Sequence, residues 1–278
     1  MQEARMFENH MDEHRNGDVV TALRAVPDAA VCRVSVVIPT LNEAENLPHV
    51  FSRLPTDLHE VILVDGGSKD NTVDVARALY PSIRIVPQSG RGKGNALACG
   101  FAACSGDVIV MLDADGSANP AEIAAFVDAL CEGADFAKGS RFIEGGGSSD
   151  ITPTRRLGNW FFSTLVNVIY GTRYSDLCYG YNAFWRHCLP AISVDCDGFE
   201  VETLINIRAA KAGLRIAEVA SFEEDRIYGD SNLRTFRDGF RVLRTIFREW
   251  PRRVAIPNPD HELRRFGDEP LPQAEAIG

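Results

Sequence analysis

The stretch Val108-Ile-Val-Met-Leu-Asp-Ala-Asp-Gly-Ser117 joins five uncharged, apolar residues to a turn that carries two carboxylates. The apolar run predicts a strand buried on both faces, so its carboxyl end is the first point where a charge can reach solvent. Asp113 and Asp115 can share a divalent cation, Mg²⁺ or Mn²⁺, whose other ligands are waters and substrate phosphates. A simple Asp-Gly turn explains the same residues, and this segment alone does not decide between the two.

Length and composition set the broad class of the protein. With 278 residues, 45% of them hydrophobic and 24% charged, the chain can form one large α/β domain or two small ones. Its formal net charge of −10 argues against nucleic-acid binding through bulk electrostatics. The seven cysteines form no Cys-x-x-Cys pair, and we find no secretory leader or membrane-spanning stretch. These features predict reduced thiols in the cytoplasm.

An apolar run followed by a helical pattern recurs along the chain. Residues 32–39, 60–65 and 83–86 predict strands that alternate with helices, and 135–142 and 214–219 predict later strands. The alternation predicts a mostly parallel central sheet with helices on both faces, which binds ligands at the carboxyl ends of its strands. We expect a mobile extension over 1–31, a single domain over 32–231, a basic amphipathic helix over 232–253 and a disordered tail over 254–278.

Polar side chains follow the early strands at the expected ligand edge. Asn42 and Glu43 lie where the first strand gives way to a helix, and Asp65 ends the second strand. Lys93 is expected to be a mobile loop cation facing the same edge, with a solvated loop lysine as the alternative. This set, gathered on one edge with the two aspartates of the opening stretch, favours a site for a metal and a diphosphate.

The loop Gly90-Arg-Gly-Lys-Gly94 resembles two phosphate-binding motifs without matching either of them. Asn95 stands where the dinucleotide fingerprint needs its third glycine. Pro87 stands where a P-loop needs its first glycine. The loop therefore does not predict a nucleotide-binding fold of either kind.

Two segments further along contribute candidate functional residues. The strand expected over 135–142 presents Arg141, and the glycine-rich loop over 144–150 can be a surface loop or a lid. Asp176 is the single acid in a neutral, aromatic segment. A buried lone acid is costly, so Asp176 has either a structural partner or a catalytic task.

The pattern over 232–250 predicts an amphipathic helix with a strongly basic surface. Apolar residues recur every three to four positions, at Leu233, Phe236, Phe240, Leu243, Phe247 and Trp250. From Arg226 to Arg253 there are eight arginines against three acids, a balance of about +5. Such a helix can lie on an anionic membrane surface, or it can dock on the domain and leave a solvated basic rim.

The ordered set of motifs from Val34 to Phe247 resembles glycosyltransferase family 2, and within it the dolichol-phosphate mannosyltransferase-like branch. The resemblance rests on Val36-Val-Ile-Pro-Thr-Leu-Asn-Glu43, Val64-Asp-Gly-Gly-Ser-Lys-Asp-Asn-Thr72, Gly92-Lys-Gly94, Asp113-Ala-Asp-Gly-Ser117, Gly139-Ser-Arg141, and Asp176 with Gly180-Tyr181. It implies a GT-A (Rossmann-like) fold, a GDP- or UDP-sugar donor and inversion at the anomeric carbon.

The resemblance also implies roles for single residues on the donor side. The metal, Mg²⁺ or Mn²⁺, is expected on Asp113 and Asp115, with Asp115 counted as catalytic. The nucleotide sugar is expected to contact Pro39, Thr40, Leu41, Asn42, Glu43, Asp65, Gly67, Lys93, Asp113 and Ala114.

On the acceptor side, the resemblance implies a polyprenyl phosphate, bound by Arg141, Arg155, Arg156 and Arg226. Arg141 is also counted as catalytic. A soluble hydroxyl acceptor, with Asp176 as the base, is the alternative. We expect a cytoplasmic protein, peripheral at the inner membrane surface, and leave homo-oligomerisation open. A sugar nucleotidyltransferase and an inactive nucleotide-binding module are less favoured.

Overall fold

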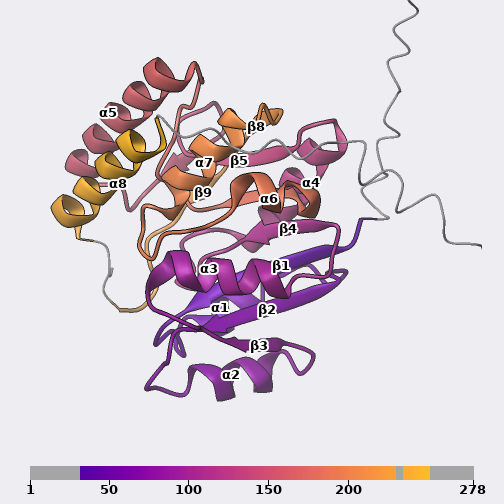
Figure 1. The fold of residues 1–278 in the computed structure, drawn as a ribbon. Helices are drawn as coiled ribbons and strands as arrows, with labels where there is room; N and C mark the ends of the chain where they lie inside the picture. Colours follow the sequence, from indigo (N-terminus) through magenta and orange to yellow (C-terminus); the bar gives the residue numbers. More distant parts are fainter. Residues whose placement is uncertain (1–31, 230–233, 251–278) are drawn as a thin grey trace, which may run out of the picture.

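The computed structural model describes residues 32–229 and 234–250 (Figure 1). The extension predicted over 1–31 and the tail predicted over 254–278 lie outside these residues. No helix in the described part of the chain combines the length and the apolar composition needed to cross a bilayer.

A seven-stranded sheet forms the centre of the molecule, in the order β3-β2-β1-β4-β7-β5-β8. Its strands are β1 Val34–Thr40, β2 Glu60–Asp65, β3 Arg84–Pro87, β4 Val108–Met111, β5 Phe136–Ser140, β7 Asn182–Trp185 and β8 Ile216–Ala220. All neighbours are parallel except β7, which runs antiparallel to β4 and to β5. The prediction of a mostly parallel sheet is confirmed, whereas β7 was not predicted.

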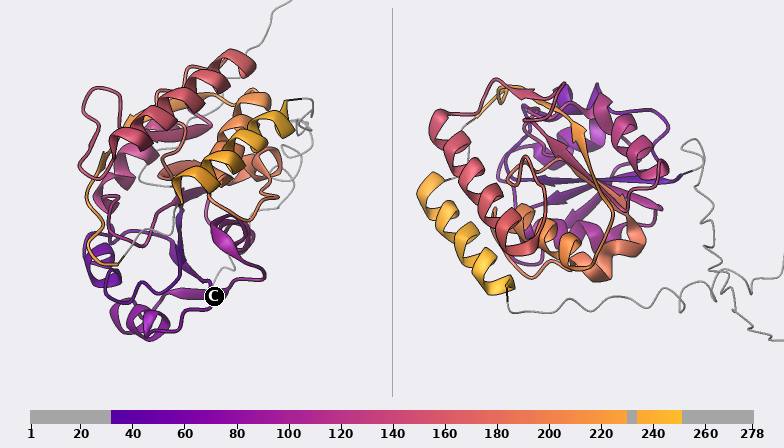
Figure 2. Two further views of the ribbon diagram at one scale, coloured as in Figure 1. Left: turned by 90° about the vertical axis from the view of Figure 1, so that its left-hand side faces the viewer. Right: turned by 90° about the horizontal axis from the view of Figure 1, so that it is seen from above.

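Helices cover both faces of this sheet, as Figure 2 shows from above. They are α1 Leu47–Phe51, α2 Thr72–Leu79, α3 Gly92–Ala103, α4 Ile123–Cys131, α5 Pro153–Tyr170, α6 Leu189–Ile192, α7 Val201–Lys211 and α8 Thr235–Glu249. Strand residues alternate between the faces: Val36 and Ile38 pack in the core beneath α1, α2 and α4, and Val37 packs in the core beneath α3, α6 and α7. The sheet therefore has two separate hydrophobic cores.

A third, smaller core joins α5 and α8 to the outer side of α7. Val166 of α5, Ile207 of α7 and Val242 and Ile246 of α8 are buried together. In Figures 1 and 2, α5 and α8 lie side by side outside the main body. The predicted apolar stripe of α8 is not the face that packs, because Phe236 and three other aromatic residues of that stripe are exposed. The helix thus docks on other helices through Val242 and Ile246, and the aromatic residues of the stripe remain available for a membrane surface.

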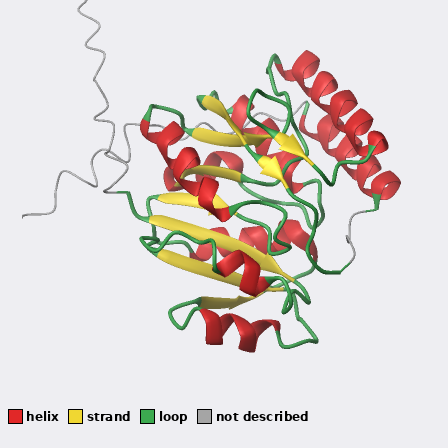
Figure 3. Cartoon of the chain, turned by 180° about the vertical axis from the view of Figure 1, so that it is seen from behind, coloured by secondary structure: helices red, strands yellow, loops and turns green. Residues whose placement is uncertain are grey.

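Two segments expected to be loops contain regular structure. Helix α3 begins at Gly92, within the stretch expected to be a loop, because Gly92 and Gly94 allow its first turn to lie against the backbone of residues 196–197. A Cβ on Gly92 would lie 2.0 Å from the Asp197 carbonyl oxygen. The glycine-rich loop over 144–150 is partly ordered, since β6 Gly147–Ser148 pairs with β9 Phe222–Glu223 (Figure 3).

Candidate active site

The turns after β1 and β2 form the first wall of the site. Asn42 has a φ of 58°, a left-handed conformation that asparagine tolerates because its side chain can hydrogen-bond locally. Its Oδ1 accepts from the Lys69 amide at 2.8 Å, and its own amide donates to Ser68 Oγ at 3.0 Å. Asp65 accepts from the amides of Gly67 and Ser68. The two turns, predicted to contact the nucleotide, are therefore joined by hydrogen bonds.

Lys93 forms the centre of a buried ion-pair group. Its Nζ lies 2.7 Å from Asp113 Oδ1 and 2.7 Å from Glu202 Oε1, and its side chain is only 11% exposed. The expectation of a mobile loop cation was therefore wrong. Burial alone would lower the pKa of Lys93, but the two carboxylates raise it above the ordinary value for lysine. Lys93 thus stays charged beside the first residue of the aspartate pair.

Gly180 provides the space that this ion-pair group occupies. A Cβ built on Gly180 would lie 2.9 Å from Lys93 Nζ and 3.2 Å from an oxygen of Asp113 and of Glu202. Any larger residue would therefore push against all three charged side chains. The close packing of these side chains explains why the Gly-Tyr motif has a glycine at position 180.

Arg226 forms a second charged group with the other aspartate. Its NH2 lies 3.0 Å from Asp115 Oδ2, and its NH1 lies 3.2 Å from Glu43 Oε1. Glu43 is buried, which raises the pKa of its carboxyl although hydrogen bonds from Asn46 and Arg226 oppose the shift. Arg226 therefore links the β1 turn to the end of β4. Its predicted role in acceptor binding stays a prediction.

The donor set at Asp113 and Asp115 suits a hard cation that keeps other ligands. In the described residues, no three His, Cys, Asp or Glu side chains come together as a metal site. Mg²⁺ is nevertheless commonly bound by only one or two protein carboxylates when substrate phosphates complete its coordination shell. Asp115 Oδ1 accepts from the amide and the hydroxyl of Ser117, while Oδ2 pairs with Arg226. The residues thus fit a metal in chemical type, and its binding would compete with Lys93 and Arg226.

Arg141 and Asp176 form a bidentate pair in the interior. Arg141 Nε lies 2.7 Å and NH2 3.0 Å from the two Asp176 oxygens, and NH1 lies 2.9 Å from Glu223 Oε2. Asp176 is fully buried. Burial alone would raise the pKa of Asp176, but hydrogen bonds and charge from Arg141 lower it below the usual value. The structure thus supplies a structural partner, one of the two alternatives expected for Asp176, and its role as a base stays a prediction.

The other two predicted acceptor arginines lie near the start of α5. Arg155 NH1 pairs with Asp150 at 2.7 Å, and the Arg155 amide donates to the capping Thr152 hydroxyl. Arg156 is exposed and stacks its guanidinium 5.5 Å from the ring centre of Phe142. Only Arg155 of the two faces the cavity described next.

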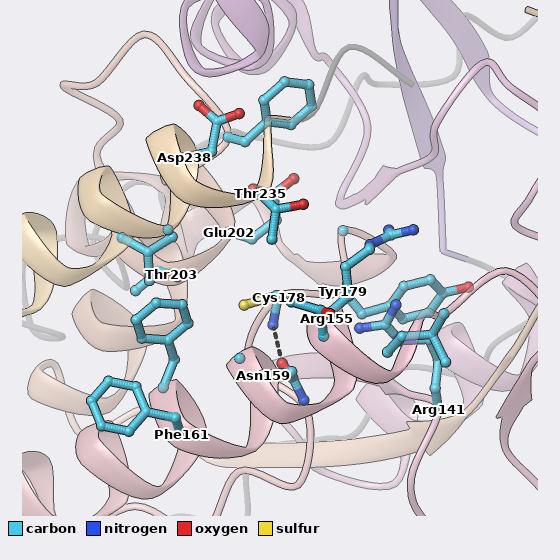
Figure 4. A pocket seen from close by; sticks show the side chains of 18 of the residues that line it. Arg141, Arg155, Asn159, Phe161, Cys178, Tyr179, Glu202, Thr203, Thr235 and Asp238 are labelled. Carbon is cyan, nitrogen blue, oxygen red and sulfur yellow. Dashed lines mark hydrogen bonds between the residues drawn. The ribbon is translucent and has the colours of Figure 1, made fainter. Parts of the chain in front are cut away.

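A cavity of about 750 Å³ leads from Asp113 to the surface between α5 and α8. Lys93, Asp113 and Glu202 lie at its polar end, and Arg141 and Arg155 also line it. Figure 4 shows these two arginines on one side and Phe161 on the other, with Asn159 hydrogen-bonded to the Cys178 amide at 3.0 Å. The remainder of the wall is mainly apolar. The lining from α5 and α8 includes Leu157, Trp160, Phe161, Phe162, Phe236, Phe240, Val242 and Leu243.

Glu202 was not singled out from the sequence. It lies on α7, far from the aspartate pair in sequence, yet its pKa is raised by burial and its carboxylate contacts Lys93. The available signal was its position beside the apolar Val201 and Leu204 on the same helix, which indicates that the carboxylate is buried. The buried Glu223, a partner of Arg141, was also missed.

Comparison with known proteins gives the family. A family model described as glycosyl transferase family 2 matches residues 35–190. Glycosyltransferase AglJ of Haloferax volcanii is 33% identical over 236 residues, which cover 84% of this chain and 74% of that protein. Undecaprenyl-phosphate mannosyltransferase of Micrococcus luteus is 32% identical over 213 residues, which cover 72% of this chain and 87% of that protein.

A solved structure with the same fold is glucosyl-3-phosphoglycerate synthase from Mycobacterium tuberculosis, in complex with Mn²⁺, UDP and glucosyl-3-phosphoglycerate. Its TM-score is 0.64 at 24% identity, over 89% of this chain and 88% of that chain. This likeness confirms the predicted GT-A-like α/β fold. Because the family model matches residues 35–190, more than half of the chain, and Glycosyltransferase AglJ is 33% identical over 84% of it, the chain belongs to the enzymes of glycosyltransferase family 2.

Proposed function

We propose that the protein transfers a sugar, with inversion, from a GDP- or UDP-sugar to a polyprenyl phosphate. The donor half of this proposal is supported by the aspartate pair at the end of β4 and by the family. The acceptor half is supported by the name of the Micrococcus luteus relative, an undecaprenyl-phosphate mannosyltransferase, and by the apolar cavity described above. The sugar and the base are left open.

On the donor side, the turn over 39–43, Asp65, Gly67 and Ala114 would contact the base and ribose. Asp113 and Asp115 would hold Mg²⁺ or Mn²⁺, which when bound offsets the charge on the departing diphosphate. Lys93 stays protonated against Asp113 and can contact a phosphate oxygen. Arg226, already paired with Asp115, adds a second cation at the same edge. These residues together bind and orient the diphosphate leaving group.

The single observation that carries the acceptor proposal is the apolar lining of the cavity. Trp160 is 63% exposed, Phe236 88% and Phe240 68%, and all three line the cavity that reaches Asp113. Large apolar side chains held open to water beside a reaction centre indicate an apolar ligand. A polyprenyl chain would cover them while its phosphate reaches the polar end. The same surface would rest on the cytoplasmic face of the membrane, making the protein peripheral.

The ionisation of the site also favours an anionic acceptor. A phosphate is already a nucleophilic anion, whereas a hydroxyl needs a base to take its proton. Asp176, the predicted base for a hydroxyl, does not line the cavity and is occupied by Arg141. The carboxylates that do line it are each paired with a cation: Asp113 and Glu202 with Lys93, Glu223 with Arg141, and Asp238 with Arg241. The phosphate acceptor therefore suits the site better.

Arg155 and Arg141 are the cavity arginines that would position the acceptor phosphate. Arg141 is paired with Asp176 and Glu223, which hold its guanidinium in a fixed orientation at the wall of the cavity. Arg155 is partly exposed and, within the described residues, its ion-pair partner is Asp150, so it can turn toward a phosphate. Arg156 and Arg226, which do not line the cavity, would act at its margins.

The test compares acceptors that differ only in chain length. Purified protein is incubated with GDP- or UDP-sugars and Mn²⁺, and the acceptor KM is measured for undecaprenyl phosphate and for a water-soluble short-chain isoprenyl phosphate. We expect a lower KM for the long chain, and we expect Trp160→Glu to raise that KM while leaving the donor KM unchanged. The exposed Val168, on the same helix but outside the cavity lining, provides the matched control Val168→Glu. Equal use of both acceptors, with no effect of Trp160→Glu, would refute the acceptor proposal.

A further inference from the structure

A second hollow, of about 420 Å³, lies between the first turn of α3 and the first turns of α8. Its lining is rich in cations, namely Arg91, Lys93, Arg234, Arg237 and Arg241. The acids that line it are Asp197 and Asp238. Five cations and two acids thus line the hollow, in a protein whose formal net charge is −10. Such a local excess in a concave site indicates an anionic ligand.

Ion pairing in the described residues accounts for only part of this charge. Lys93 pairs with Asp113 and Glu202, and Arg241 pairs with Asp238 at 3.3 Å. Asp238 is further used, because its other oxygen accepts from the Arg234 amide at 2.7 Å. In the ranges 32–229 and 234–250, no carboxylate lies within 4.0 Å of the guanidinium of Arg91, Arg234 or Arg237. These three arginines are therefore the lining cations that have no carboxylate partner within the described residues.

The three arginines come from two different elements that face each other. Arg91 precedes α3, whereas Arg234 and Arg237 stand three residues apart at the start of α8, where they share a side of the helix. None of them lines the larger cavity, although the two hollows share Lys93, Phe199 and Asp238. A guanidinium binds phosphate oxygens through two parallel N–H groups, so several of them around one hollow suit a phosphate best.

We infer that the hollow between α3 and α8 binds a phosphate group through Arg91, Arg234 and Arg237. A membrane lipid headgroup is one source of that phosphate, since the exposed Phe236 and Phe240 alternate with these arginines at the start of α8. A free phosphate compound is the other source. The inference does not depend on the identity of the acceptor, because the arginines lie outside the cavity proposed for it.

The experiment uses the full chain and measures binding without turnover. One arm titrates inorganic pyrophosphate by calorimetry in the absence of metal. The other measures flotation with phosphatidylcholine vesicles, with and without phosphatidylglycerol. The variants are Arg91→Gln, Arg237→Gln and their combination, and Arg244→Gln is the matched control. Arg244 is exposed on α8 and does not line the hollow, so Arg244→Gln removes the same charge from the helix without changing the hollow.

We expect each hollow variant to weaken binding about fivefold in one of the two arms, with the combination weaker still. A loss confined to phosphatidylglycerol vesicles identifies a lipid headgroup, and a loss of pyrophosphate binding identifies a free phosphate compound. Arg244→Gln should lose less than either single variant. Equal losses for Arg244→Gln and Arg237→Gln, or no loss in either arm, would overturn the inference. A thermal melt of each variant shows whether it is folded.

Discussion

Replacing Asp176 with Asn separates a structural role of this carboxylate from a catalytic one. Asn keeps the shape of the side chain but removes the charge that pairs with Arg141 through two hydrogen bonds, at 2.7 and 3.0 Å. Both partners are buried, so water cannot replace the lost interaction. Arg141 would keep only Glu223, at 2.9 Å.

The expected loss of stability is large because a buried charge loses part of its compensation. Removing one partner of a buried ion pair typically costs about 3–5 kcal/mol of unfolding free energy. Glu223 remains, so we expect the lower end, about 3 kcal/mol. For a domain of this size that loss lowers the melting temperature by roughly 10 °C.

The assay combines urea unfolding with steady-state kinetics well below the melting temperature of the variant. We expect Asp176→Asn to unfold at lower urea and to keep kcat within a few-fold of the parent, since Asp176 does not line the cavity. Glu218→Gln is the control, because Glu218 is a partly buried acid on β8 outside the ion pair. Unchanged stability together with a loss of activity would refute this reasoning and restore Asp176 as a base.

Three further outcomes follow from the same geometry. Because the folded-state pKa of Asp176 is lowered, its stabilising effect is present above its unfolded pKa of about 3.9 and is lost as the pH falls through the folded value. The stability gap between parent and Asp176→Asn should therefore shrink in urea melts below about pH 4. Glu202→Gln should lower kcat about tenfold, the effect of about 1.5 kcal/mol for one charged hydrogen bond, and an unchanged kcat would exclude a role in holding Lys93. Gly180→Ala should lower activity through displacement of Lys93, which a crystal structure of the variant would show.

The sequence was sufficient for the parallel half of the sheet because buried parallel strands leave a strong local signal. The runs at 36–39, 61–64 and 108–111 are uninterrupted and apolar, and each is followed by the polar residues of a turn. Strand β7 was not predicted because its antiparallel position between β4 and β5 depends on contacts between segments far apart in the chain. Its residues, Asn182–Trp185, have no distinctive alternation.

Long-range charge pairing was equally out of reach. The pattern of residues placed Lys93, Asp113 and Asp115 at one edge, but not the contact of Lys93 with Glu202, which is 109 positions away in the chain. The helix over 235–249 was predicted from its amphipathic spacing, yet spacing cannot say which face finds a partner. Here Val242 and Ile246 pack on α5 and α7, whereas Phe236, Phe240, Phe247 and Trp250 of the predicted stripe are exposed.

The most direct test of the central claim identifies the product of the reaction. Purified protein is incubated with GDP- and UDP-sugars, Mn²⁺ and undecaprenyl phosphate, and the lipid extract is analysed by mass spectrometry beside an Asp115→Ala control. The account predicts a polyprenyl-phosphate sugar with the inverted anomeric configuration, made by the parent and absent with Asp115→Ala. Nucleotide release without a lipid-linked product, or equal product from both proteins, would contradict it.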